Sequence, residues 1–213
     1  MALPIILGIT GASGAIYAVR LLEVLRAAGR EVHLTISSSG RDVLNHELNL
    51  NIDLNNFDPA HLQLNATTVP PSLLAPHSSP LAPAPLHFFR HNDFMAPMAS
   101  GSFLTAGMVI CPCSGTTLSA VAAGSASNLI QRAAEVHLKE RRKLILVPRE
   151  APLSLAHIDN MRRVTEAGAV VLPASPGWYY EVKSPLDLVD FVVDRICDQL
   201  AVEHTLCKRW GQE

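Results

Sequence analysis

The sequence predicts an α/β protein with a Rossmann-like, doubly wound and mostly parallel sheet. Three observations carry this prediction. Short apolar runs alternate with helical patterns along the chain, several of these runs are apolar without interruption, and a glycine-containing turn follows the first run. Alternating strands and helices are typical of a parallel sheet, and continuous apolar runs suit strands that are covered on both faces.

Each element is predicted from its own pattern. Strands are expected at residues 4–9, 108–111, 144–147 and 169–172 from continuous apolar runs, and at residues 31–37 from alternation of polar and apolar side chains. Helices are expected at residues 15–28, about 40–48, 116–123, about 129–140, 154–167 and 185–200. The last helix has a start signal, because Ser184 is followed by Pro185 and, three residues on, by Asp187.

A chain of 213 residues predicts one domain spanning residues 1–213. Residues 58–86 do not follow the strand–helix rhythm. This stretch contains Pro59, Pro70, Pro71, Pro76, Pro80, Pro83 and Pro85. It offers few hydrogen-bond donors for a sheet, so we expect an extended excursion on the surface.

The composition excludes several classes of protein. Hydrophobic residues make up 48% and charged residues only 17%, with a net charge of −2. Global disorder is excluded by this apolar content, and the lack of a basic excess argues against a nucleic-acid partner. No apolar run has the length of a membrane span, and the first residues lack the basic start of a signal peptide. So little charge suggests that other subunits cover much of the surface.

The cysteines and histidines predict neither a disulfide framework nor a metal site. The four cysteines lack the paired spacing of zinc ligands, so we expect a reducing, cytoplasmic setting, with small buried thiols at Cys111 and Cys113. The histidines are scattered without a metal-ligand pattern, and His157 is expected to be structural.

Polar residues follow the predicted strands where the strands end. Because ligands bind outside the carboxyl ends of a parallel sheet, these residues are candidates for one site. The turn Thr10-Gly-Ala-Ser-Gly14 is neither Gly-x-Gly-x-x-Gly nor a P-loop, yet it offers N–H groups at a helix start, a seat for phosphate. Ser37 stands where a dinucleotide site would have an acidic residue, which favours a mononucleotide such as FMN. A plain strand–helix turn remains the alternative.

Two hydroxyl-rich turns and one charged pair complete the candidates. Ser37 to Ser39 and Ser114 to Thr117 suit phosphate or ribityl hydroxyls, but each turn taken singly is better explained as a helix cap. Glu150 beside Arg149, after a buried strand, can shuttle protons. Arg132, Arg149 and Arg195 are suited to hold a phosphate through paired N–H donors.

The chain also resembles a known family. The motifs that carry the resemblance are Thr10-Gly-Ala-Ser-Gly-Ala15, Asn92-Asp-Phe-Met-Ala-Pro97, Ala99-Ser-Gly-Ser102, Cys111-Pro-Cys-Ser114, Leu138-Lys-Glu-Arg-Arg142 and Pro148-Arg-Glu-Ala-Pro152. Together they are similar to the signature of the UbiX-type flavin prenyltransferases. Only residues 49–86, approximately, lie outside the resemblance.

The resemblance implies a metal-independent transfer of a dimethylallyl group from dimethylallyl phosphate to reduced FMN. A fourth ring would form between N5 and C6. The product, prenylated FMN, would pass to a UbiD-type decarboxylase, as in ubiquinone biosynthesis. The family also implies a homododecamer with active sites at subunit contacts.

The same resemblance implies roles for individual residues. FMN would be held by Gly11, Ala12, Ser13, Ser37, Ser114, Gly115, Thr116, Thr117 and Arg149. The dimethylallyl phosphate would be held by Lys139, Tyr179 and Arg195, with Ser100, Gly101 and Arg132 nearby. The flavin ring or the aromatic side chain of Phe94 would stabilise the allylic cation, and Glu150 or Ser13 would relay the proton lost from C6. Tyr179 and Arg195 meet if the last helix packs back across the carboxyl edge of the sheet.

Two other functions remain open from the sequence. An FMN-dependent cysteine decarboxylase of the same fold needs a catalytic histidine, for which His46 is a weak candidate. A non-catalytic flavin carrier would leave the Arg149–Glu150 pair and the set of Lys139, Tyr179 and Arg195 without a purpose.

Overall fold

Six strands form one parallel sheet in the computed structural model, which describes residues 2–64, 83–179, 182–208 and 211. The strands are β1 (Ile5–Ile9), β2 (Val32–Ile36), β3 (Leu86–Arg90), β4 (Gly107–Cys113), β5 (Leu144–Pro148) and β6 (Val170–Val171). Their order is β3-β2-β1-β4-β5-β6, and every neighbouring pair is parallel. The predicted doubly wound, Rossmann-like fold is therefore confirmed.

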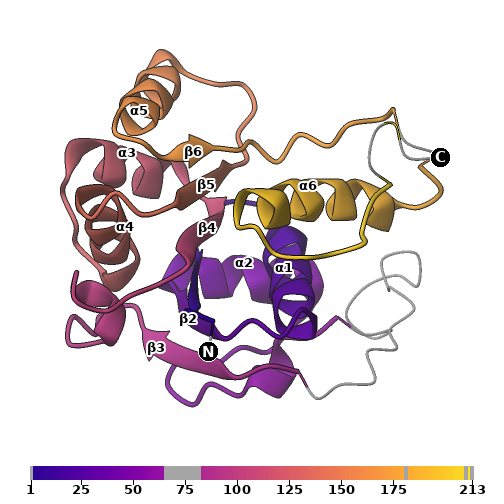
Figure 1. The fold of residues 1–213 in the computed structure, drawn as a ribbon, viewed down its shortest axis with the longest axis horizontal. Helices are drawn as coiled ribbons and strands as arrows, with labels where there is room; N and C mark the ends of the chain where they lie inside the picture. Colours follow the sequence, from indigo (N-terminus) through magenta and orange to yellow (C-terminus); the bar gives the residue numbers. More distant parts are fainter. Residues whose placement is uncertain (1, 65–82, 180–181, 209–210, 212–213) are drawn as a thin grey trace.

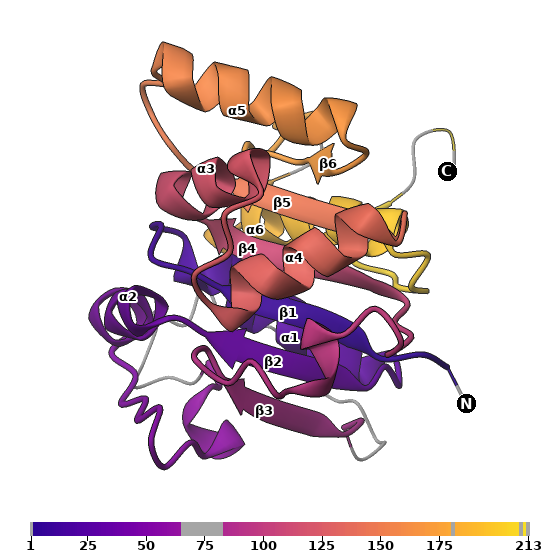
Figure 2. The same ribbon diagram turned by 90° about the vertical axis from the view of Figure 1, so that its left-hand side faces the viewer.

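Helices cover both faces of this sheet (Figures 1 and 2). They are α1 (Ala15–Ala27), α2 (Ser38–Leu48), α3 (Gly115–Ala123), α4 (Leu129–Lys139), α5 (Leu155–Glu166) and α6 (Pro185–Gln199). Apolar side chains of α1, α2 and α6 pack into one core, and those of α3, α4 and α5 into the other. Each predicted helix is present, with ends shifted by two residues or fewer.

Strand β2 is fully buried, although its sequence alternates polar and apolar residues. All five of its residues are buried, although His33 and Thr35 alternate with apolar neighbours. The strand lies between β1 and β3, and helices cover its faces, so the alternation here does not mark a solvated side.

Strand β3 was not predicted from the sequence. It begins at Leu86, within the proline-rich stretch, and two prolines precede it closely. It is an edge strand, the place where nearby proline is tolerated, and the carbonyl of Pro85 accepts a hydrogen bond from the N–H of Val32 (3.1 Å). A short 3-10 turn lies at Pro59–His61, and most of the remaining excursion lies outside the described residues.

The start signal predicted for the last helix is present in the structure. Ser184 and Asp187 form a capping box, in which the carboxylate of Asp187 accepts from the N–H of Ser184 (2.7 Å). The expectation of buried thiols is confirmed for Cys111 and Cys113, and Cys197 is buried as well. Burial raises the pKa of Cys113 to about 12, so this thiol remains protonated at neutral pH.

No helix in the described part of the chain combines the length and the hydropathy that crossing a membrane requires.

Candidate active site

The sheet has a switch point between β1 and β4, where the strand order reverses direction. The loops that follow these strands are tied together by Thr10, which is buried. Its hydroxyl donates to the carbonyl of Pro112 (2.7 Å) and accepts from the N–H of Ser114 (2.8 Å). In the sequence, Thr10 was only the first residue of the glycine turn, without a predicted role of its own. In the structure it fixes the two loops that form the centre of the candidate site.

The glycine turn packs closely against the start of α2. A Cβ atom at Gly11 would lie 2.5 Å from Cβ of Ser39, so only glycine fits there. Gly14 caps α1 with a φ of 108°, a left-handed conformation that also favours glycine. The backbone therefore requires or favours glycine at both ends of the turn.

Glu47 changes the expected role of this turn. Its carboxylate accepts hydrogen bonds from the N–H groups of Gly14 (2.9 Å) and Ala15 (2.9 Å). These are donors that a phosphate at the start of α1 would need, so the expectation of a phosphate seat at that helix start is wrong. Glu47 was missed because a glutamate on an amphipathic helix such as α2 ordinarily faces solvent.

The two hydroxyl turns cap helices at the same edge of the sheet. The hydroxyl of Ser37 accepts from the N–H of Gly40 (3.0 Å) and starts α2. The hydroxyl of Ser114 accepts from the N–H of Thr117 (3.3 Å) and starts α3. The cap interpretation is thus confirmed for both serines. Each helix start still carries N–H groups without an intrahelical acceptor, which can bind an anion.

The Arg149–Glu150 pair lies at the end of β5, and both residues are exposed. Nε of Arg149 donates to the carbonyl oxygen of Ser13 (3.1 Å), which brings this strand end against the glycine turn. Tyr17 of α1 lies in the same region. Burial raises the pKa of its hydroxyl, with a further rise from Cys111 and an opposing effect of the Arg149 charge. Tyr17 was not a candidate from the sequence.

An open cleft of about 540 Å³ adjoins this edge between α3, α4 and α5. It is lined by Gly115, Thr116, Ser119, Ala120, Ser125, Ser127, Gln131, Ala156, His157 and Asn160. His157 has the structural role expected of it, since its side chain and that of Ser154 form the capping box of α5. A Cβ atom at Gly115 would lie 2.7 Å from Nε2 of His157, so the glycine allows α3 to approach α5.

A second group of candidates lies at the opposite edge of the sheet. Helix α4 starts beside the carboxyl end of β3, where the N–H of Leu129 donates to His91, and it ends near the amino end of β5. Lys139, at its end, pairs with Glu140. Both side chains lie against Gly101, whose carbonyl accepts from Arg142. A five-residue strand is about 16 Å long, so this group is separated from the glycine turn by the length of the sheet.

The remaining candidates lie on α4 and in the loop that leads into β4. Ser100 precedes Gly101 in that loop, and its hydroxyl lies 2.9 Å from the hydroxyl of Ser102. Nε of Arg132 donates to the carbonyl of Ala99 (3.2 Å), and Phe94 is half exposed. The loop and α4 thus hold these residues on one flank of the protein.

Tyr179 and Arg195 are brought to one side of α6. The ring of Tyr179 packs edge-to-face on Phe191 (5.7 Å between centroids), and Arg195 lies one helical turn further on. However, α6 does not cross the carboxyl edge, so that expectation is wrong. It packs on a face of the sheet beside α1, because Arg20 of α1 binds Asp190 of α6 (2.6 Å) and the apolar side of α6 is buried in that core.

Comparisons with known proteins agree with this architecture. The chain is 46% identical over 209 residues to the flavin prenyltransferase UbiX of Pseudomonas aeruginosa, covering 98% of this chain and 94% of that one. It superposes on the crystal structure of AnUbiX in complex with FMN and dimethylallyl pyrophosphate with a TM-score of 0.82, at 33% identity and full coverage of both chains. A dodecameric FMN-dependent UbiX-like decarboxylase from Escherichia coli O157:H7 gives a TM-score of 0.79 at 34% identity, covering 98% and 100%.

A parallel sheet with a glycine turn and two helix starts at its switch point defines a Rossmann-like, nucleotide-binding class of protein. Residues 2–197 match the family described as Flavoprotein. The chain belongs to this flavoprotein family and, within it, to the flavin prenyltransferases of the UbiX type.

Proposed function

We propose that the carboxyl edge of the sheet binds reduced FMN and that the dimethylallyl group of dimethylallyl phosphate is transferred to it there. The observation that carries the proposal is the convergence of the glycine turn, two helix starts and the Arg149–Glu150 pair at that edge. These residues fit a flavin mononucleotide. The helix starts at Ser37 and Ser114 and the guanidinium of Arg149 supply donors for its phosphate and ribityl chain.

The carboxylate of Glu47 favours one placement of the phosphate. It occupies the start of α1, so an anion there would be repelled. The starts of α2 and α3 carry the first-turn N–H groups that remain. Gly11, Ala12 and Ser13, together with Gly115, Thr116 and Thr117, would then hold the rest of the flavin nucleotide.

Reduced FMN, when bound, supplies the nucleophilic N5 and C6 atoms. The chain's own residues are proposed to do the rest. As the allylic C–O bond breaks, Lys139, Tyr179 and Arg195 stabilise the charge of the departing phosphate, assisted by Arg132, Ser100 and Gly101. The aromatic face of Phe94 stabilises the allylic cation. Glu150, with the hydroxyl of Ser13 as a second relay, accepts the proton that C6 loses when the ring closes.

Anaerobic incubation with reduced FMN and dimethylallyl phosphate, followed by mass spectrometry of the flavin, tests this function. Prenylated FMN is the expected product. Unchanged FMN with both the mono- and the diphosphate donor would contradict the proposal. We further propose a cytoplasmic enzyme whose product passes to a UbiD-type decarboxylase, as in ubiquinone biosynthesis.

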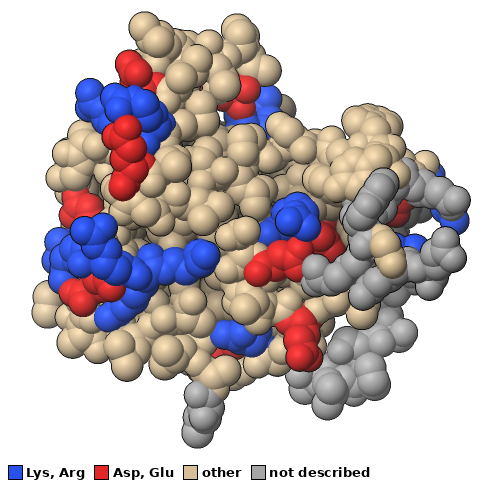
Figure 3. All heavy atoms as spheres, turned by 45° about the horizontal axis from the view of Figure 1, so that its top comes forward, with Lys and Arg blue, Asp and Glu red and all other residues tan. Residues whose placement is uncertain are grey.

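The separation of the two groups of candidates supports a composite active site. Lys139, Ser100 and Gly101 lie at the opposite edge from Arg149 and Glu150, so we propose that one subunit completes the site of another in a dodecamer. Exposed apolar side chains offer contact area, among them Leu153, Leu155 and Ile158 at α5. Figure 3 shows a face on which uncharged atoms form a continuous area between a few groups of charged side chains.

Assembly should therefore be inseparable from activity. The purified protein is expected to sediment as a large closed oligomer. Lys139→Ala and Glu150→Gln, each expected to be strongly impaired alone, should recover part of the activity when they are co-expressed, because some mixed sites contain neither change. A fully active monomer, or mixed oligomers with no recovery, would contradict the composite site.

Replacing Arg195 by alanine should weaken donor binding and leave FMN binding nearly unchanged. Loss of one charged hydrogen-bond donor to a phosphate costs about 1.5–3 kcal/mol, a roughly ten- to hundredfold rise in the donor concentration needed. Tyr179→Phe should produce a smaller loss of the same kind. Donor titrations at saturating FMN measure both effects. An FMN defect as large as the donor defect would remove both residues from the donor site.

A further inference from the structure

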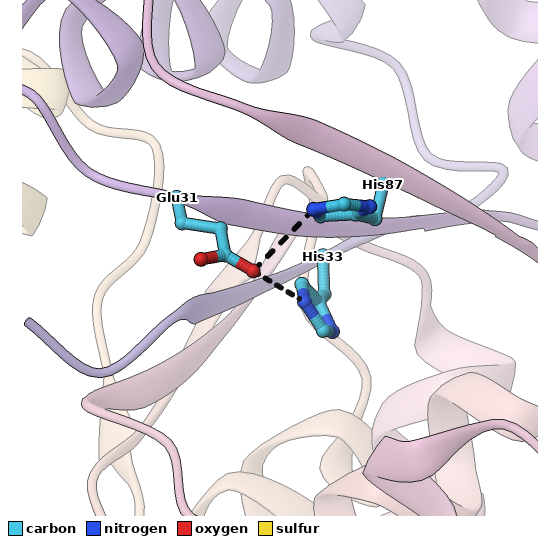
Figure 4. Close-up of side chains that lie close together, drawn as sticks. All are labelled: Glu31, His33 and His87. Atoms are coloured by element: carbon cyan, nitrogen blue, oxygen red, sulfur yellow. Dashed lines mark hydrogen bonds and ion pairs between the residues drawn. The ribbon is translucent and has the colours of Figure 1, made fainter. Parts of the chain in front are cut away.

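Three side chains of types that can bind a metal meet at the amino ends of β2 and β3, at the edge of the sheet opposite the glycine turn (Figure 4). Glu31 directly precedes β2, and His33 is the second residue of that strand. His87 is the register partner of His33 on the neighbouring strand β3. Side chains two residues apart on a strand share one face, and so do register partners on parallel strands, so all three project to the same side.

The distances between these side chains suit a single ion. Oε1 of Glu31 lies 3.0 Å from Nε2 of His33 and 3.5 Å from Nε2 of His87. One ligand atom from each residue lies within 4.8 Å of the other two. With metal–ligand bonds of about 2.0–2.1 Å, ligand atoms of a tetrahedral zinc site are about 3.3 Å apart. The two distances from Oε1 of Glu31 are therefore close to the spacing in such a site.

The side chain of His33, the central residue of the cluster, is held in place by packing. The imidazole of His33 is buried and stacks on the ring of Phe103, with Phe89 at the same centroid distance of 5.2 Å. Nδ1 of His33 is buried without a hydrogen-bond partner among the described residues, so the polar contact of the ring goes through Nε2 to Glu31.

We propose that Glu31, His33 and His87 form a site for one divalent first-row transition-metal ion such as Zn²⁺. A water molecule would be the fourth ligand. Two imidazoles and one carboxylate favour such ions over Mg²⁺ and Ca²⁺, which prefer oxygen ligands. The exposed side chain of His87 leaves the site open to solvent. The ion links the edge strand β3 to β2, so its role is to stabilise the sheet.

Calorimetric titration of the chelator-treated oligomer with Zn²⁺ tests the site. One ion per chain is expected, and both His87→Ala and Glu31→Gln should abolish this binding event. His46→Ala is the matched control, because it removes an exposed histidine of α2 that is remote from the cluster. His87 and Glu31 are preferred to the buried His33, whose replacement would disturb the core.

Thermal unfolding provides an independent measurement. At a Zn²⁺ concentration about a hundredfold above Kd, Tm should rise by about 5–10 °C in the unmodified protein and in His46→Ala, and not in His87→Ala. Mg²⁺ at the same concentration should leave Tm unchanged. An absence of zinc binding would overturn the proposal. So would equal zinc binding by His87→Ala, which would place the ion elsewhere, for example at Asp194, Asp198 and His204.

Discussion

Glu150→Gln is expected to lower the rate of prenylated-flavin formation by about 10²–10⁴-fold, the usual contribution of a positioned general acid or base. Glutamine keeps the shape of the side chain and removes its ability to take up a proton. Glu150 is exposed at the end of β5, beside Arg149, whose guanidinium contacts the glycine turn. In the proposed mechanism this carboxylate accepts the proton that C6 loses, so the variant would lack the main proton acceptor. Anaerobic single-turnover assays with mass spectrometry of the flavin measure the effect.

The affinity for FMN provides the first control for this variant, because the proposed FMN contacts remain and binding should be unchanged. Glu166→Gln provides the second. Glu166 is an exposed glutamate of α5 that pairs with Arg162, remote from the glycine turn, and its replacement should leave the rate unaffected. A wild-type rate for Glu150→Gln would show that this residue has no acid–base role.

Asp190→Ala is expected to lower the free energy of unfolding by about 3 kcal/mol, because it leaves a buried guanidinium without its main partner. Arg20 binds both carboxylate oxygens of Asp190, at 2.6 and 3.1 Å, and the two side chains are only 9% and 14% exposed. Glu23 remains as a weaker partner at 3.3 Å. The pair joins α1 to α6, the helix that carries Arg195. Urea unfolding at a fixed protein concentration measures the change.

Two further variants isolate the effect of burial. Asp42→Ala removes the exposed Arg41–Asp42 pair and should cost no more than about 1 kcal/mol. Arg20→Met combined with Asp190→Leu replaces both buried charges by apolar groups and should recover most of the loss. Equal destabilisation by Asp190→Ala and Asp42→Ala would show that the buried pair does not stabilise the contact between α1 and α6.

Much of the candidate site was predictable because polar side chains at the ends of parallel strands must share one edge. The glycine turn, the caps at Ser37 and Ser114 and the Arg149–Glu150 pair all follow buried strands, and the structure brings them to that edge. Glu47 and Tyr17 were not predictable. Their contacts depend on how α2 and α1 are placed against the turn, and no local pattern reports such a contact between distant segments.

The sequence by itself determined the helices and every strand except β3, since hydrophobic period and capping residues act within a few neighbours along the chain. It also carried the motifs that the family shares. Only the tertiary structure decided that β3 is an edge strand, that Lys139 lies at the opposite edge from Arg149, and that His33 and His87 are side by side. These relations depend on strand order and register, which result from burying all the apolar faces at once.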